Sequence, residues 1–313
     1  MADNWLMSAA RFLRPSSAPA RTAAEPPAAP ASAAVEPPAV LALTPSNRYV
    51  DDEDAVSYRK RLIREMEDED AECATAYRMI DHKISNLADP AQREHAPHHI
   101  IRFLTTYAIT PKGPGVLVDI GASEIYGAPL GTLKGWDIRS VPVLSFDYEV
   151  DRLPFPDESA DGVLICEVIE HFSLDPLFCL IEINRILKPN GFVVVTTPNA
   201  ASWFSIYRVL NQEHPSCWPV YSVDESKRQH HIHAREYLVS EVEQLLDAAG
   251  FGEFTTLTRD YAIRPPYRPI PGVSTAHRGE TIFSRACKVG PPKKRALQPI
   301  YLEDVDFKSG DRR

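Results

Sequence analysis

Cysteine is scarce in this sequence, and long apolar runs are missing. Five cysteines are scattered over 313 residues, and no C-x-x-C motif occurs. An odd number of dispersed cysteines is typical of a reducing compartment and argues against a disulfide framework. No apolar run reaches the ~18 residues that a membrane span needs, and the first residues lack the basic flank of a secretory signal. We therefore expect a cytoplasmic protein without a membrane span.

Positive charge and glycine-rich loops are also lacking. The formal net charge is −9 at pH 7, whereas binding to nucleic acid depends on a basic surface that displaces counterions. The sequence contains no G-x-G-x-x-G motif, which marks many dinucleotide-binding folds. These absences disfavour a nucleic-acid partner and a dehydrogenase with a nucleotide cofactor.

Composition divides the chain into four segments. Residues 1–46 are an Ala/Pro-rich leader that we expect to be disordered, because repeated prolines forbid a helix and small side chains bury little surface. Its first dozen residues are the one part that could form a short helix and contact a protein partner. Residues 47–110 favour a helical lead-in or cap, residues 111–290 one α/β domain, and residues 291–313 a peripheral tail.

Short, β-branched apolar runs predict buried parallel strands at residues 116–120, 162–166 and 192–196. A predicted helix over 175–187 joins the last two strands in a βαβ unit, and repeated units form a doubly wound sheet. Two later runs, 254–258 and 280–288, predict an antiparallel hairpin. Ligands bind such sheets at the carboxyl ends of the strands, so we expect the residues that follow each parallel strand to line one crevice.

Five motifs follow one another in this region: DIG at 119–121, LPFPDES at 153–159, EVIEH at 167–171, EINRILKP at 182–189 and TPN at 197–199. In this order they resemble class I S-adenosylmethionine-dependent methyltransferases, above all the small-molecule group labelled type 11. The resemblance covers roughly Gly113 to Gly290. It implies a Rossmann-like, mostly parallel sheet with an antiparallel C-terminal hairpin, and S-adenosylmethionine as the cofactor.

The resemblance also implies which residues bind the donor. Asp119 would anchor the loop after the first strand, and the backbone from Gly121 through Ala122 and Ser123 would approach the methionine portion of the donor. Leu153 would lie beside the adenine, although it suits a core position equally well. Glu167 would contact the donor or the acceptor.

Residues 122–150 depart from the family pattern, and the donor-binding region is shortened. The segment from Ala128 to Trp136 looks too short and too rich in glycine for a long helix, and one clear strand follows at 141–146. Two residues compete for the role of the acid that contacts the donor. Asp137 lies 16 residues beyond Gly121 and could bind the ribose, whereas Asp147 could belong to a third strand and contact the adenine. With a degraded donor site the chain would be a non-catalytic binding or assembly protein.

Three residues are candidates for catalysis. His171 stands where the transferring methyl should lie, and its ordinary pKa near ~6.5 suits a base that removes a hydroxyl proton. Glu167 precedes it, and His233 belongs to a second motif, His233-x-Arg235-Glu-Tyr237, which resembles the acceptor side of the same family. The alternative is that these residues only brace the structure. No cysteine or acidic residue stands at metal-ligand spacing beside the histidines at 230–233, so we expect no metal.

The interpretation from sequence is therefore an S-adenosylmethionine-dependent methyltransferase that methylates oxygen on a small molecule or glycan. An aromatic-rich insertion between Asn199 and Gln229 would then be part of the core or a lid over the acceptor.

Overall fold

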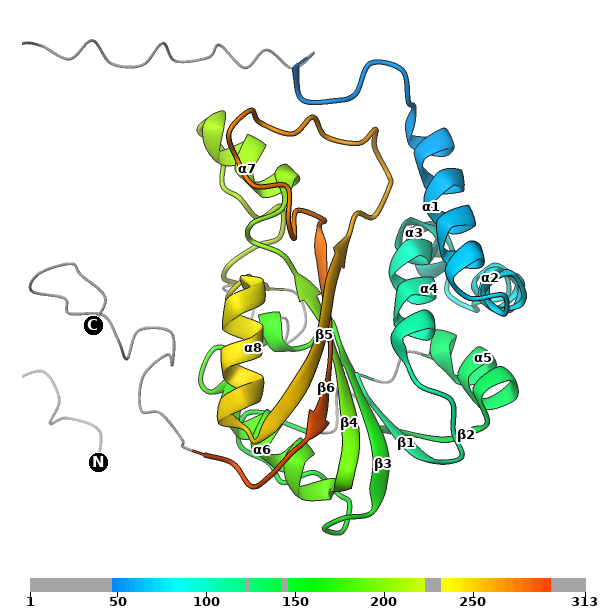
Figure 1. Cartoon of the computed structure of the whole chain (residues 1–313), viewed down its shortest axis with the longest axis vertical. Coiled ribbons are helices and arrows are strands. Elements are labelled where there is room, and N and C mark those ends of the chain that lie inside the picture. The colour runs from blue at the N-terminus through cyan, green and yellow to red at the C-terminus, as the bar shows by residue number, and fades with distance from the viewer. Residues whose placement is uncertain (1–46, 122–123, 142–145, 223–231, 294–313) are drawn as a thin grey trace, which may run out of the picture. The chain divides into compact units, whose positions relative to one another are not determined.

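A computed structural model describes residues 47–121, 124–141, 146–222 and 232–293. Within them the chain forms a six-stranded sheet of order β2-β1-β3-β4-β6-β5 (Figure 1). The strands are β1 (Gly115–Ile120), β2 (Trp136–Val141), β3 (Ala160–Cys166), β4 (Leu187–Pro198), β5 (Phe251–Arg259) and β6 (Thr281–Lys288). The first four are parallel, and β6 runs antiparallel to both β4 and β5. The predicted fold class is confirmed.

Helices cover both faces of the sheet. One face carries α1 (Ala55–Glu69), α2 (Cys73–Ser85), α3 (Pro90–His95), α4 (Ile100–Ile109) and α5 (Glu124–Lys134), and the other carries α6 (Pro176–Ile186) and α8 (Val239–Ala248) (Figure 1). Alternate strand residues supply the two cores. Val118 and Val163 pack with α6 and α8, whereas Leu117 and Leu164 pack with the N-terminal helices. This two-sided burial explains why the strands are apolar without alternation.

The connection between β1 and β3 differs from the prediction. An 11-residue helix, α5, occupies Glu124–Lys134 although Pro129 lies inside it. The strand after it, Trp136–Val141, was not predicted, whereas the strand predicted at 141–146 lies mostly outside the described residues, which omit 142–145. Trp136 fixes the position of β2, because its indole N–H donates to the Pro111 carbonyl at 2.8 Å and its ring packs against Phe192.

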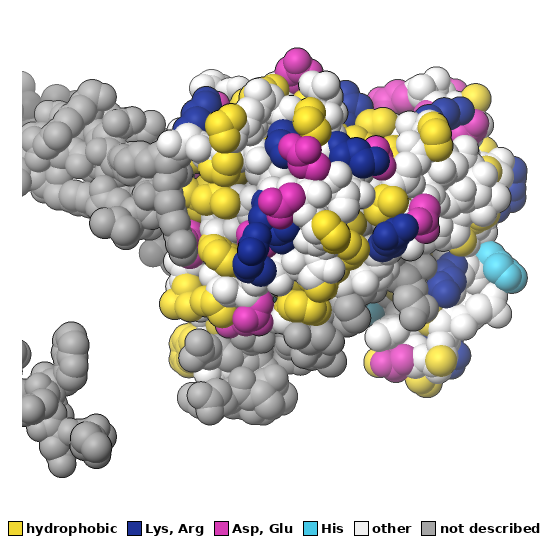
Figure 2. All heavy atoms as spheres, turned by 90° about the horizontal axis from the view of Figure 1, so that it is seen from below, with side chains coloured by type: hydrophobic (Ala, Val, Ile, Leu, Met, Phe, Trp, Pro, Cys, Tyr) yellow, Lys and Arg dark blue, Asp and Glu magenta, His cyan; other side chains and the backbone are white. Residues whose placement is uncertain are grey.

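Surface charge is mixed rather than gathered. Acidic and basic side chains lie interspersed on the face that Figure 2 shows. Many of them form exposed pairs, such as Lys188 with Asp161 at 2.8 Å. No helix in the described ranges is long and apolar enough to cross a membrane.

Arg185 explains why two of the motifs occur together. It lies on α6, and its guanidinium donates to the carbonyls of Leu153 and Phe155 and to the carboxylate of Asp157, all in the LPFPDES motif. The same guanidinium pairs with the buried Glu182 at 2.7 Å. A charged group with this many fixed partners holds the 153–159 loop against α6.

We expect Arg185→Ala to lower the free energy of unfolding by about 3 kcal/mol, because it leaves the carboxylate of Glu182 buried without its main partner. Arg139→Ala is the matched control, since among the described residues Arg139 pairs with the exposed Asp137 and such a pair contributes at most about 1 kcal/mol. Urea denaturation of both variants measures the difference. Equal stability of the two would show that the Arg185 cluster does not hold the loop.

Candidate active site

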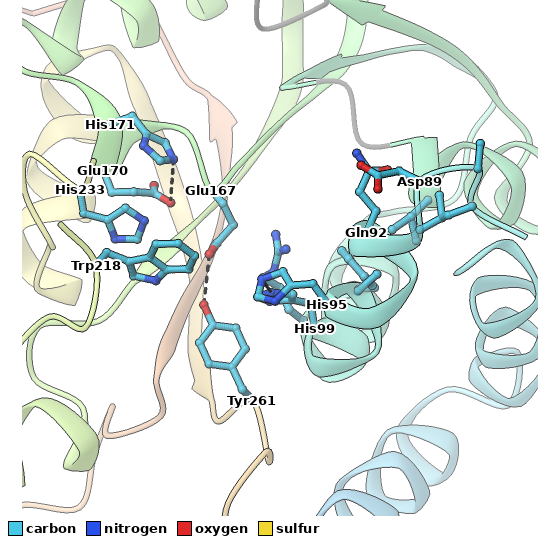
Figure 3. Close-up of a pocket in the computed structure, with 16 residues that line it drawn as sticks. Asp89, Gln92, His95, His99, Glu167, Glu170, His171, Trp218, His233 and Tyr261 are labelled. Carbon is cyan, nitrogen blue, oxygen red and sulfur yellow. Dashed lines mark hydrogen bonds and ion pairs between the residues drawn. The ribbon is translucent and has the colours of Figure 1, made fainter. Parts of the chain in front are cut away.

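A cavity of about 640 Å³ lies at the carboxyl ends of β1 and β3. One wall comes from α3, the 3-10 helix η3 (Ala96–His99) and α4, and it carries His95 and His99 (Figure 3). The opposite wall carries Glu167, Trp218 and His233, together with residues of the short 3-10 helix η5 (Ile169–His171). Tyr261, which follows β5, reaches between the two walls.

Two adjacent threonines at the end of β4 hold the acids of the EVIEH motif. The Thr196 hydroxyl donates to Glu167 at 3.0 Å, and the Thr197 hydroxyl donates to Glu170 at 3.0 Å. Glu167 has a left-handed backbone with φ of 54° and also accepts a hydrogen bond from the Tyr261 hydroxyl at 3.2 Å. These bonds turn the chain sharply after β3 and direct the motif into the cavity.

Glu170 is completely buried. Burial, and then the nearby charge of Glu167, raise its pKa well above the ordinary value. Its Oε1 atom accepts no hydrogen bond from the described residues.

His171 is oriented by a backbone carbonyl. Its Nδ1 lies 2.6 Å from the Ile232 oxygen, an acceptor, so Nδ1 carries the proton in the neutral ring. Nε2 lies 4.0 Å from Glu170 Oε1. The ring meets the ring of His233 edge-on, at 5.1 Å between centroids, and His233 stacks on Trp218. The structure therefore brings together two of the predicted catalytic residues that lie 62 positions apart in the sequence.

The helical wall is also rich in histidine. His99 Nε2 and His95 Nε2 lie 2.9 Å apart, and the ring of His99 meets Tyr261 edge-on. Burial, followed by the positive charge of Arg102, lowers the pKa of His99 to about 3, so His99 is neutral at physiological pH. A second cavity of about 200 Å³ shares His95, His99, Trp218 and Tyr261 with the first and extends it toward Phe204 and Ile263.

Asp119 and Gly121 lie at the carboxyl end of β1, as predicted for the donor site. Asp119 is buried, and Gly121 has φ of 96°. A Cβ at Gly121 would lie 3.0 Å from Val168 Cγ2, so the backbone is open here only because the residue is glycine. This bare backbone beside a buried acid fits the methionine portion of S-adenosylmethionine.

The other predicted donor residues are placed differently. Ala122 and Ser123 lie outside the described residues. Asp137 pairs with Val116 near the amino end of β2, and its side chain is 60% exposed. Since the cavity lies at the opposite end of the strands, this position corrects the proposed ribose contact for Asp137. Asp147 accepts a hydrogen bond from the Glu149 amide in a turn, and Leu153 is a core residue.

Sequence reasoning gave no role to several residues that line the cavity, namely Glu170, Trp218, Tyr261 and the histidines of η3 and α3. Glu170 stood inside the EVIEH motif, which was expected to line the crevice, and Trp218 inside the aromatic-rich insertion, but neither position indicated which way its side chain points. Tyr261 and His99 carry no local signal, because only the tertiary fold brings them to the carboxyl ends of the strands.

Comparisons with known proteins agree with these observations. A family model described as a methyltransferase domain, of type 11, matches residues 132–195. A probable S-adenosylmethionine-dependent methyltransferase of Mycolicibacterium smegmatis is 31% identical over 106 residues, which are 34% of each chain. The chain thus spans about a third of the length of this curated relative.

Solved structures with a similar arrangement include two methyltransferases. One, from Thermotoga maritima, is described as a possible histamine N-methyltransferase; it is 20% identical, with a TM-score of 0.40 over 68% of this chain and 99% of its own. Another, from Archaeoglobus fulgidus, is 17% identical, with a TM-score of 0.41 over 63% of this chain and 94% of its own. Residues 132–195 thus match a methyltransferase domain of type 11, and about a third of the chain is similar to a probable S-adenosylmethionine-dependent methyltransferase.

Proposed function

We propose that this protein transfers a methyl group from S-adenosylmethionine to an oxygen atom of a small molecule or saccharide. The observation that carries the proposal is the cavity of about 640 Å³, which is lined by Glu167 and by a potential base, His171. A cavity of this size suits a small acceptor rather than a macromolecule.

Asp119 and Gly121 are the residues that would hold the methionine portion of the donor. When bound, the donor supplies an activated methyl group, so the protein contributes mainly proximity and orientation. Glu167, fixed by Thr196 and Tyr261, is placed to orient a polar group of either ligand. Aromatic rings of Trp218 and Tyr261 offer flat apolar surfaces for the body of the acceptor.

His171 is the base in this proposal. Because Nδ1 donates its proton to the Ile232 carbonyl, Nε2 is the nitrogen of the neutral ring that can accept the proton of an acceptor hydroxyl. The side chain is 20% exposed, enough to contact a ligand in the cavity. His233, packed edge-on against it, would hold the ring in place.

We expect His171→Ala to lower turnover by roughly 100-fold or more, the usual contribution of a general base, while affinity for the donor stays the same. His82→Ala is the control, since His82 is exposed on α2. Mass spectrometry of extract components incubated with isotope-labelled donor identifies the acceptor and measures turnover. Undiminished turnover in His171→Ala would remove the residue as base.

Calorimetric titration tests the donor itself. S-adenosylmethionine and its demethylated product should both bind the protein with measurable heat. If neither binds at millimolar concentration, the proposed activity is wrong and a non-catalytic binding role takes its place.

A further inference from the structure

We propose that Glu170, His171 and His233 form a binding site for one divalent transition-metal ion at the wall of the cavity. Each residue offers one ligand atom, and the three atoms all lie within 4.8 Å of one another. Figure 3 shows the three side chains grouped on one wall, facing the histidine-bearing helices. The prediction of no metal rested on neighbours in the sequence, whereas here the carboxylate comes from a segment far from His233.

The unused atom of Glu170 supports the proposal. One carboxylate oxygen accepts the Thr197 hydroxyl, while Oε1 accepts no hydrogen bond from the residues that the structure describes. A completely buried carboxyl that leaves one oxygen unsatisfied is costly, and buried charges are normally paired or bound to metal. A cation at this point would satisfy that oxygen and favour the ionised form of Glu170.

The surroundings of the two histidines match those of metal ligands. A ligating histidine usually directs its second ring nitrogen to a carbonyl or carboxylate, which fixes the ring. His171 fits this pattern, since its Nδ1 lies 2.6 Å from the Ile232 oxygen. His233 Nδ1 lies 3.6 Å from Glu236 Oε1, near a carboxylate but beyond hydrogen-bond distance. His233 is also buried and stacked on Trp218, so its ring is held in place before an ion binds.

The ligand set indicates the class of ion. Two imidazoles and one carboxylate suit zinc, cobalt, iron or manganese, whereas magnesium and calcium prefer all-oxygen sites. Ligand atoms in a tetrahedral zinc site lie about 3.4 Å apart, given bonds of about 2.1 Å. Bringing the three atoms from at most 4.8 Å apart to this separation requires each of them to move by roughly 1 Å.

Three protein ligands leave one position open toward the cavity, as in catalytic zinc sites. There the ion would bind the hydroxyl oxygen of the acceptor and lower its pKa, with the proton passing to water. This consequence rests on the proposed O-methylation. In the metal-bound protein His171 Nε2 binds the ion and no longer accepts the hydroxyl proton. The ion instead promotes loss of that proton by lowering the pKa of the hydroxyl.

Untagged full-length protein, stripped with EDTA, should be titrated with Zn²⁺ by calorimetry and with Co²⁺ by visible absorption. We expect one ion per chain, a cobalt spectrum typical of nitrogen and oxygen ligands, and no competition from Mg²⁺. Glu170→Gln, which keeps the size of the side chain, and His233→Ala should each weaken binding by at least ~100-fold. Circular dichroism confirms that each variant is folded.

His95→Ala is the matched control, because His95 lines the same cavity outside the proposed ligand set. It should bind the ion within about twofold of the parent, against the ~100-fold expected for a ligand. The proposal is overturned if the parent binds no ion, or if His95→Ala loses the ion while Glu170→Gln retains it. Donor titration of the stripped protein is a separate readout, so a failure of donor binding with intact metal binding would count against the proposed function alone.

Discussion

Gly121→Val should abolish measurable binding of S-adenosylmethionine, with an affinity loss of at least ~100-fold. Two physical effects act together. The left-handed backbone at φ of 96° is strained for a residue with a branched side chain. The new Cβ would also lie 3.0 Å from Val168 Cγ2, so the Val168 side chain would have to give way by a few tenths of an ångström. Each 1.4 kcal/mol of strain that binding must overcome lowers affinity about tenfold.

Gly127→Ala is the matched control for this experiment. Gly127 lies in α5, only six residues further on, and outside its own turn of helix no atom of the described residues lies within 4 Å of the position its Cβ would take. Alanine there should leave donor affinity unchanged and favour the helix. Calorimetric titration of both variants, with circular dichroism to confirm folding, measures the effect. Donor binding by Gly121→Val at parental affinity would mean that the pocket lies elsewhere.

The free energy of unfolding should fall by about 3 kcal/mol as the pH rises from 4.5 to above 7, because a buried pair of acids must then lose its proton. Glu280 is buried against Asp260, and burial followed by the charge of Asp260 raises the pKa of Glu280 to about 7. Burial also raises the pKa of Asp260. Arg264 lies 3.7 Å from Glu280, and the Tyr58 hydroxyl donates to Asp260 at 2.7 Å.

The direction follows from proton linkage. The folded protein keeps a proton on Glu280 that the unfolded chain loses near its ordinary value of 4.5. The contribution of the protonated Glu280 to the free energy of unfolding is therefore complete below pH 4.5 and is lost as the pH rises through about 7. Urea denaturation at several pH values measures this loss.

Glu280→Gln removes the titrating group and should flatten the pH dependence over this range. Glu253→Gln is a suitable control, since Glu253 lies on the exposed stretch of β5. An unchanged pH profile in Glu280→Gln would assign the titration to another group.

The sheet could be predicted from sequence because its strands are buried on both faces. The runs at 116–120, 162–166 and 192–196 had no other simple interpretation, and β1, β3 and β4 occupy them. The strand over Trp136–Val141 was not predicted, because its pattern is weak: Asp137 and Arg139 interrupt the apolar residues, and only Trp136 and Val141 are buried. Its position depends on the contact of Trp136 with Pro111, which is not visible in local sequence.

The candidate site was predictable only in part. Glu167 and His171 were found because they directly follow a buried strand, where the topology places ligands. His95, His99 and Tyr261 reach the same cavity from helices and from the segment after β5, and no local spacing connects them. The orientation of Glu170 toward His171 and His233 likewise depends on the Thr197 hydroxyl, which is a tertiary contact.

The paired threonines of β4 tie the site to the pleat of the sheet. Consecutive residues of a strand point to opposite faces, so Thr196 and Thr197 each reach a different acid and cannot exchange roles. Deleting or inserting a single residue within β4 would turn both hydroxyls away from their carboxylates at once. The positions of the two acidic groups are thus set by the alignment of β4 with β3 and β6.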